Sequence, residues 1–274
     1  MRIGDRPASL QGLLSWNHRR SKTDWVKSTV INLELFARGD PTLGEIHRDP
    51  ESPSRIDLSQ AGLGDGSPPW PTHMYPWTDL ESFLETRGLS SLPLIGYGSL
   101  LNRRSARLTI SDPDAQRRAV VAFGVRRVFD YVLDDESLRR YGPVDDPRAI
   151  AALNAIATSR VEDTVNGVLC LVSRADIHPL RLRELGYNLT PVECVDFDDR
   201  MGARSRAYIL TCPDDPPDGV RRRADKIAPH PAYLQVCIEG AREISSEFLD
   251  EFLSSTFLAD GRTRLAEWDR VLSP

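Results

Sequence analysis

One glutamate in the 274-residue chain stands beside an apolar helical segment and could carry acid/base chemistry. Glu184 lies within residues 182–187 (LRELGY). A carboxyl group that packs against an apolar helix face has its pKa raised by burial, so it can accept and donate protons near neutral pH. The commoner alternative is a surface glutamate paired with Arg181 or Arg183. The local residues leave both interpretations open.

A glycine turn at residues 96–101 (GYGSLL) could bind an anion through its backbone. It begins like a dinucleotide fingerprint, but Leu101 stands where the third glycine belongs, and no Gly-Lys-Ser/Thr follows as in a phosphate-binding loop. Ser99 lacks the second flanking glycine of a nucleophile elbow. Gly98 still allows close approach of the backbone to a ligand, and successive N–H groups after a strand can hold an anion. A plain tight turn is the alternative.

The histidines and cysteines predict neither a metal site nor a cofactor. No pair has metal-ligand spacing, and no Cys/His or Ser/His partnership is visible. The cysteines stand far apart, and three of them lie in apolar segments, which predicts buried free thiols in a reducing cytosol. They are Cys170, Cys194, Cys212 and Cys237.

The charge and hydropathy of the chain exclude two classes of partner. The net charge of −5 argues against a broad nucleic-acid-binding surface. The densest basic cluster, residues 221–223, has aspartates beside it and is interpreted as a solvated loop. No run approaches the roughly 18 apolar residues that span a bilayer, and residues 1–20 lack a signal-peptide core. We therefore expect a cytoplasmic protein that binds neither nucleic acid nor a membrane. The residues leave open whether it works alone or as a homodimer.

The elements that must position the turn and the glutamate are mostly strands. Apolar runs rich in β-branched residues predict strands at residues 92–97, 119–133 for most of its length, 166–173, and a pair at 192–197 and 204–211. Helices are predicted at residues 176–185 and after a cap at Ser245 or Ser246. Because the helices are few and irregularly spaced, we expect an α+β domain around a compact mixed sheet or barrel, and not a doubly wound α/β fold.

Residues 1–90 are expected to form an N-terminal extension to a domain at residues 91–274. A helix capped at Thr23-Asp24 and ending near Gly39 precedes a stretch dense in proline and glycine, and a short helix follows at residues 79–87. This region contains no motif that we can assign to chemistry.

Four stretches, in this order, resemble the gamma-glutamylcyclotransferase family. They are residues 97–101 (YGSLL); residues 124–130 (GVRRVFD); residues 166–168 (NGV) with Arg183-Glu184 and Gly186-Tyr187; and residues 231–234 (PAYL) with residues 239–241 (EGA) and 248–253. They are similar to the family's Tyr-Gly-Ser turn, its Gly-x-x-Arg-x-Phe strand, its catalytic glutamate segment, and its C-terminal tyrosine and helix. The resemblance spans roughly residues 92–258. The Leu100-Leu101 and Arg183-Glu184 forms resemble the bacterial and glutathione-degrading branches.

The resemblance implies a compact mixed β-barrel or sheet flanked by helices. It also implies a metal- and cofactor-independent enzyme whose small gamma-glutamyl substrate is cleaved by its own α-amine, releasing 5-oxoproline and a free amine. Glu184 would then be the catalytic acid/base. The substrate-binding residues that it implies are Tyr97, Gly98, Ser99, Leu100, Leu101, Tyr187 and Tyr233.

Two other functions stay open at this point. One is an enzyme of the same fold that removes or transfers a gamma-glutamyl group in a biosynthetic pathway, with residues 134–152 and the first third of the chain setting substrate size. The other is a non-catalytic binding module that keeps the pocket. The presence of both Glu184 and Tyr233 argues against the second, because binding alone needs no acid/base.

Overall fold

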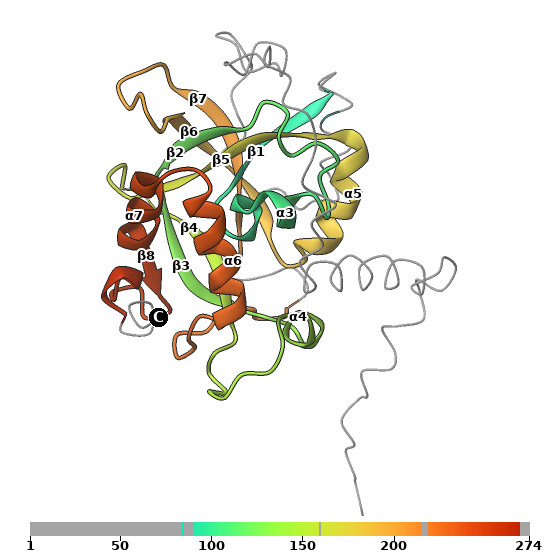
Figure 1. Ribbon diagram of the computed structural model, residues 1–274, viewed down its shortest axis with the longest axis vertical. Coiled ribbons are helices and arrows are strands. Elements are labelled where there is room, and N and C mark those ends of the chain that lie inside the picture. The colour runs from blue at the N-terminus through green and yellow to red at the C-terminus, as the bar shows by residue number, and fades with distance from the viewer. Residues whose placement is uncertain (1–83, 85–89, 159, 215–218, 269–274) are drawn as a thin grey trace, which may run out of the picture. The chain divides into compact units, whose positions relative to one another are not determined.

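A closed five-stranded barrel forms the centre of the computed structural model, which describes residue 84 and residues 90–158, 160–214 and 219–268. Its strand order is β1-β5-β2-β6-β7, with β7 returning to β1 (Figure 1). The strands are β1 (Ser91–Gly96), β2 (Arg118–Phe123), β5 (Thr164–Ser173), β6 (Asn188–Asp196) and β7 (Ser205–Thr211). Neighbours are antiparallel except for β1 and β7, which are parallel. The predicted α+β fold around a compact mixed barrel is confirmed.

A second sheet, in the order β4-β3-β8, lies beside the barrel. Its strands are β3 (Val125–Val132), β4 (Ala151–Ala157) and β8 (Thr256–Leu258). The run at residues 119–133 is therefore two strands in two sheets and not one. Gly124, with a φ of 71°, supplies the left-handed residue that ends β2 and redirects the chain into β3. Strand β4 was not predicted, because its alanine-rich residues carry little strand signal.

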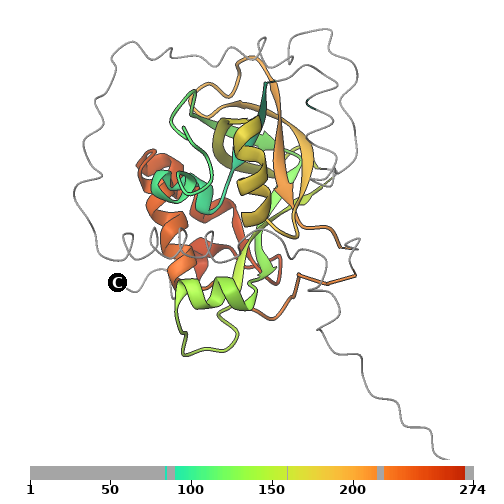
Figure 2. The ribbon, with the colours of Figure 1, turned by 90° about the vertical axis from the view of Figure 1, so that its right-hand side faces the viewer.

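Helices flank the barrel and connect its strands. They are η4 (Ser99–Leu101), α3 (Arg103–Ala106), α4 (Asp135–Tyr141), α5 (Arg174–Arg183), α6 (Pro231–Arg242), α7 (Ser246–Ser255) and η5 (Leu265–Glu267). The predicted cap of α7 is confirmed, since the Ser245 hydroxyl accepts from the Phe248 N–H at 3.1 Å. Helix α5 lies alongside the barrel strands, and α6 and α7 pack on each other (Figures 1 and 2).

Apolar side chains from both sheets and from the helices form one core, and the four cysteines lie within buried segments. All four are free and buried, as predicted. Burial raises the pKa of the Cys170 thiol to about 11 and that of Cys237 to about 12, so these thiols stay protonated at neutral pH.

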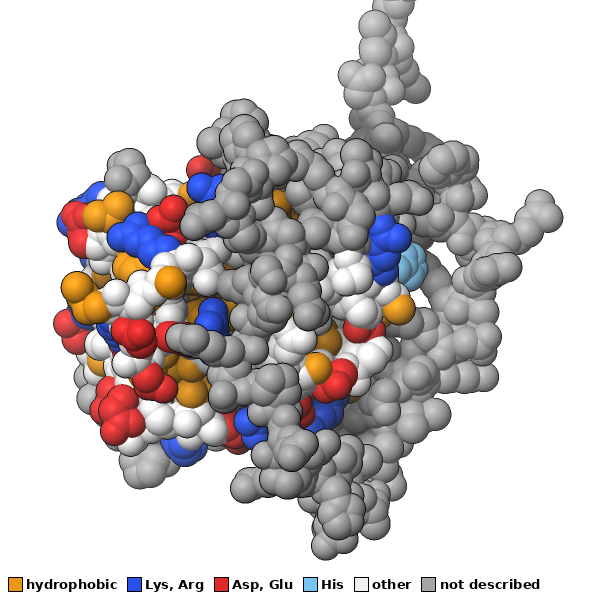
Figure 3. Space-filling model, turned by 90° about the horizontal axis from the view of Figure 1, so that it is seen from above, with side chains coloured by type: hydrophobic (Ala, Val, Ile, Leu, Met, Phe, Trp, Pro, Cys, Tyr) orange, Lys and Arg blue, Asp and Glu red, His pale blue; other side chains and the backbone are white. Residues whose placement is uncertain are grey.

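Basic and acidic side chains are interspersed on the face shown in Figure 3. Residues 221–223 were interpreted as a solvated loop, but this is wrong for Arg223: its Nε lies 2.7 Å from the buried carboxylate of Asp130.

Within the described ranges, no helix has the length and apolarity that a membrane crossing requires. The helices predicted in residues 1–90 lie outside the described residues, apart from Leu84, which is helical and buried.

Candidate functional site

One half-open pocket brings together the glycine turn and the segment that carries Glu184. Its empty space is about 290 Å³, including the solvent-facing mouth. Five parts of the chain contribute to it: the end of β1 with η4, strand β4, the end of α5, strand β7 and helix α6. The lining residues are Gly96, Tyr97, Gly98, Ser99, Leu100, Leu153, Glu184, Tyr187, Leu210 and Tyr233. Seven of the eight residues singled out from the sequence are therefore neighbours in space.

The turn after β1 contributes Gly98, Ser99 and Leu100 to the lining of this pocket. Within the described part of the chain, no hydrogen bond engages the amides of Gly98, Ser99 or Leu100. The carbonyls on the other side of the turn are occupied: Gly98 O accepts from Leu101 N at 2.9 Å, and Ser99 O accepts from Asn102 N at 3.3 Å. A ligand oxygen can therefore accept from these amides without breaking an existing hydrogen bond.

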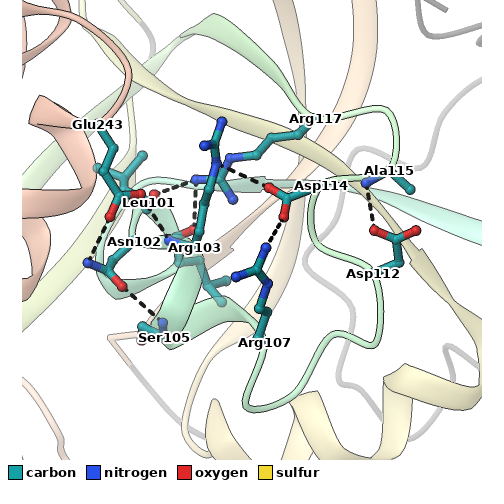
Figure 4. Close-up of polar contacts among 11 residues, drawn as sticks. Leu101, Asn102, Arg103, Ser105, Arg107, Asp112, Asp114, Ala115, Arg117 and Glu243 are labelled. Atoms are coloured by element: carbon teal, nitrogen blue, oxygen red, sulfur yellow. Dashed lines mark hydrogen bonds and ion pairs between the residues drawn. The ribbon is translucent and has the colours of Figure 1, made fainter. Parts of the chain in front are cut away.

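Leu101 was implied as a substrate-binding residue, but it does not line the pocket. Its side chain is fully buried in the core, and its N–H is used inside the turn. The chain beyond it is held by polar contacts that Figure 4 shows. Arg117 donates to the Leu101 carbonyl, Asn102 Oδ1 accepts from Ser105 N at 2.9 Å, and Asn102 Nδ2 lies 3.5 Å from Glu243 Oε1. These contacts fix where η4 ends.

Glu184 follows α5 directly and caps its C-terminal end. Its N–H donates to Leu180 O at 2.9 Å, so the helix holds the backbone of the residue that carries the carboxyl group. The side chain is 14% exposed, and its Oε1 lies 3.1 Å from Arg183 Nε. Burial raises the pKa of Glu184, while the positive charges of Arg183 and Arg140 partly offset that rise. The alternative of a surface glutamate paired with Arg183 therefore holds for the pairing but not for the exposure, because the paired side chain is largely buried.

Arg183 also joins α5 to the glycine turn, a role that the sequence analysis did not identify. Its Nη2 donates to Ser99 Oγ and to Ser105 Oγ, each at 2.9 Å, and its Nη1 donates to Ser105 O at 2.6 Å. One guanidinium therefore fixes the separation between Glu184 and the turn. The adjacent Arg-Glu pair is a local signal, but only the fold shows that Ser99 lies within its reach.

Two tyrosines of the pocket have hydroxyls that are committed to the backbone. Tyr97 Oη donates to Leu210 O at 2.7 Å, and Tyr187 Oη donates to Leu153 O at 2.6 Å. Burial raises the pKa of both phenols well above their usual value. These side chains form walls of the pocket and join β1 to β7 and the end of α5 to β4. Leu153 and Leu210 carry no local signal in the sequence, because their places in the lining depend on strand packing.

Tyr233 comes from α6 and lines the pocket with its hydroxyl close to Gly98. A Cβ atom added to Gly98 would lie 2.7 Å from Tyr233 Oη, so only glycine leaves room for this hydroxyl. The Tyr233 ring meets Phe129 edge-on at 6.3 Å and Tyr141 edge-on at 5.5 Å between centroids. Tyr141 ends α4, so residues 134–152 do reach the neighbourhood of the pocket.

The described residues contain no cluster of three or more His, Cys, Asp or Glu side chains that could hold a metal ion. The residues that line the pocket provide a largely buried carboxyl group, phenol rings and backbone amides that carry no hydrogen bond within the described ranges. Together they define an α+β barrel protein with a site suited to proton transfer and to binding of a small oxygen-rich ligand.

Comparisons with known proteins find low-identity matches among solved structures. No family model and no curated protein sequence matches the chain. Among solved structures, a gamma-glutamyl cyclotransferase is 16% identical, with a TM-score of 0.42 over 59% of this chain and 86% of that one. A yeast gamma-glutamyl cyclotransferase specific to glutathione is 15% identical, with a TM-score of 0.40 over 61% and 95%. An uncharacterized human protein is 14% identical, with a TM-score of 0.41 over 60% and 86%. These values do not identify the reaction, so the functional proposal depends on the geometry of the site.

Proposed function

We propose that this protein is a gamma-glutamylcyclotransferase-like enzyme that converts a gamma-glutamyl amide into 5-oxoproline and a free amine. The observation that carries the proposal is the shared pocket. Glu184, whose carboxyl group is largely buried, lines one small space together with Gly98, Ser99 and Leu100, whose N–H groups carry no hydrogen bond within the described residues. The resemblance of four sequence stretches to this family, noted above, supports the same reaction.

The reaction needs little beyond a correct substrate conformation and proton transfer. The Glu184 carboxylate takes a proton from the α-ammonium group, and the resulting amine attacks the side-chain carbonyl carbon of the same molecule. The new C–N bond closes the ring, the bond to the leaving nitrogen breaks, and Glu184 returns the proton to that nitrogen. Both protons lost by the α-ammonium group end on the released amine, which leaves as an ammonium ion. Because the attack is intramolecular, holding the reactive conformer supplies much of the rate.

The turn would hold the oxygens that carry negative charge. Backbone amides at Gly98, Ser99 and Leu100 can stabilise the oxyanion that forms during attack or hold the α-carboxylate. The Ser99 hydroxyl already accepts from Arg183, so Ser99 acts as a binding residue and not as a nucleophile. Tyr233 would donate from the opposite wall, while Tyr97 and Tyr187 shape the pocket.

Helix α4 would influence which leaving amine fits. Its last residue, Tyr141, packs on Tyr233, and the charge of its neighbour Arg140 acts on Glu184. A carboxylate on the leaving group, as in a gamma-glutamyl peptide, would find a favourable field here, whereas an alkylamine leaving group would not. We therefore propose gamma-glutamyl peptides, with glutathione as the first to test, ahead of gamma-glutamyl amines.

The test is release of 5-oxoproline from a panel of glutathione, gamma-glutamyl dipeptides and gamma-glutamyl-alkylamines, measured with the full chain. Turnover of peptides with slow or no turnover of alkylamines is the expected result. Preferential turnover of alkylamines would favour the biosynthetic alternative. Binding of 5-oxoproline with no turnover of any panel member would show a binding module and overturn the proposal.

A further inference from the structure

Arg127 is a buried cation on β3, behind the glycine turn. Its side chain is fully inaccessible to solvent, and within the described ranges no carboxylate forms an ion pair with it. Its guanidinium donates only to neutral oxygens, which are Thr256 Oγ1, Tyr97 O, Asn166 O, Asn166 Oδ1, Phe252 O and Ser255 Oγ. It also stacks on the Phe252 ring at 4.1 Å. Burial lowers the pKa of Arg127 to about 9, which shows how unfavourable this environment is for a charge.

One of these bonds reaches the turn that lines the pocket. Arg127 Nη1 donates to the carbonyl of Tyr97 at 3.3 Å and to the carbonyl of Asn166 at 2.8 Å. The Tyr97–Gly98 peptide is trans, because the described chain has no cis peptide bond. The C=O and N–H of a trans peptide point in opposite directions. With the Tyr97 carbonyl directed to Arg127, the Gly98 N–H points away from Arg127, and Gly98 lines the pocket.

The same contact changes how strongly the Gly98 N–H donates. A hydrogen bond to a peptide carbonyl polarises the amide and strengthens its N–H as a donor, and a cationic donor does so more than a neutral one. The carbonyls of the next two peptides, at Gly98 and Ser99, accept from the neutral N–H groups of Leu101 and Asn102. Three peptide groups in this turn have an N–H without a hydrogen bond in the described ranges. Among them, the Tyr97–Gly98 peptide is the one whose carbonyl accepts from a charged donor, Arg127.

We propose that Arg127 is a positioning residue that fixes the Tyr97–Gly98 peptide with its N–H toward the pocket and strengthens that N–H as a donor to a ligand oxygen. The inference rests on the proposed function only in taking the ligand to be a gamma-glutamyl compound or 5-oxoproline. Arg127 does not touch the ligand. Its effect passes through one peptide bond.

The experiment follows the backbone amide resonance of Gly98 in the ¹⁵N-labelled full chain, together with the affinity for 5-oxoproline. In Arg127→Met we expect the Gly98 proton resonance to move upfield. We expect 5-oxoproline to bind about 5- to 30-fold more weakly, the loss of roughly 1–2 kcal/mol from one charge-strengthened hydrogen bond. Arg127→Lys keeps the charge and should restore part of both changes. Arg126→Met is the matched control, because the Arg126 side chain lies on the same strand but pairs with Asp163.

Ser255→Ala serves if Arg127→Met does not fold, since it removes one acceptor of the guanidinium and leaves the turn untouched. It should move the Gly98 resonance in the same direction by a smaller amount. An unchanged Gly98 resonance in folded Arg127→Met, or in Ser255→Ala, would overturn the proposal, as would an equal change in Arg126→Met. None of these readouts needs turnover. A wild-type protein that cleaves no gamma-glutamyl compound would therefore end the proposed function while the Gly98 resonance still decides the role of Arg127.

Discussion

Arg183 Nε lies 3.1 Å from Oε1 of Glu184, its neighbour in sequence, and both side chains are largely buried, at 11% and 14% exposed. The pairing gives Glu184 two opposing influences, because burial favours the protonated acid and the guanidinium favours the carboxylate. Burial has the larger effect, so the pKa of Glu184 is raised. A group tuned in this way can both accept and return a proton, which is what the proposed reaction requires.

Replacing this carboxyl group should remove turnover and leave the fold intact. Glu184→Gln keeps the size of the side chain but cannot exchange protons, so we expect kcat to fall by about 10²- to 10⁴-fold. Titration with 5-oxoproline should still show binding. Glu193→Gln is the control, because Glu193 lies on the exposed face of β6 and pairs with Arg204 at 2.7 Å. Comparable turnover in Glu184→Gln and the parent protein would remove Glu184 from its proposed role.

The pH dependence of the reaction should report the raised pKa of Glu184. Because the carboxylate is the form that accepts the substrate proton, kcat/KM should rise with pH through the pKa of Glu184. This limb should lie above the value of about 4.3 of an ordinary glutamate. Arg140→Gln removes a positive charge that favours the carboxylate, so the pKa should rise further and the limb should move to higher pH. Arg139→Gln, on the exposed neighbour in α4, should leave it in place. A limb that moves down in Arg140→Gln would contradict this assignment.

The pocket tyrosines should separate into structural and functional hydroxyls. Tyr97→Phe and Tyr187→Phe each leave a backbone carbonyl without its buried donor, so the free energy of unfolding should fall by about 1–3 kcal/mol with little change in kcat. Tyr233→Phe, in contrast, should lower kcat/KM by about 5- to 30-fold and leave the free energy of unfolding nearly unchanged. Urea denaturation and steady-state kinetics on the three variants check the division. Loss of turnover in Tyr187→Phe with unchanged stability would place its hydroxyl among the ligand contacts.

Gly98→Ala should disturb the pocket by contact with Tyr233. The added Cβ atom would lie 2.7 Å from Tyr233 Oη and 3.5 Å from Leu153 Cδ1, so the phenol has to move. We expect turnover to fall by about 10²-fold, as for other small displacements of a positioned group. The same contact should lower the thermal stability of Gly98→Ala. The double variant Gly98→Ala/Tyr233→Phe removes the hydroxyl from this contact, so we expect it to recover thermal stability but not turnover. Recovery of both thermal stability and turnover would show that the Tyr233 side chain fills space and that its hydroxyl has no role in the reaction.

The fold class, and most of the residues that line the candidate site, could be predicted because their signals are local. Apolar runs of strand length marked β1, β5, β6 and β7, and the glycine turn and the Arg-Glu pair each occupy a few adjacent residues. The features that could not be predicted depend on tertiary packing. Gly124 interrupts the apolar run at residues 119–133, but a single glycine in a strand pattern marks a bulge or bend as often as a strand end. The composition therefore does not show that Gly124 divides the run between two sheets. Strand β4 was missed because alanine is a poor strand former, yet it supplies Leu153 to the pocket.

Arginine partners were the least predictable part. Nothing in the neighbouring residues indicates that Arg127 is buried, yet its side chain is inaccessible to solvent. Arg223 looks like part of a solvated basic cluster, but it pairs with Asp130 across the fold. A long cationic side chain can reach partners far away in sequence, so its surroundings are set by packing and not by its neighbours in the chain.

The order in which the pocket walls occur along the chain has a consequence for biosynthesis. The turn at Gly98 is made early in the domain, Glu184 follows much later, and Tyr233 comes from α6, after the last strand of the barrel. A nascent chain that has released only the barrel strands from the ribosome has the acid and the amides but lacks the tyrosine that α6 contributes to the pocket lining. The site becomes complete only when α6 docks, so any activity appears late in synthesis, after the barrel strands have been made.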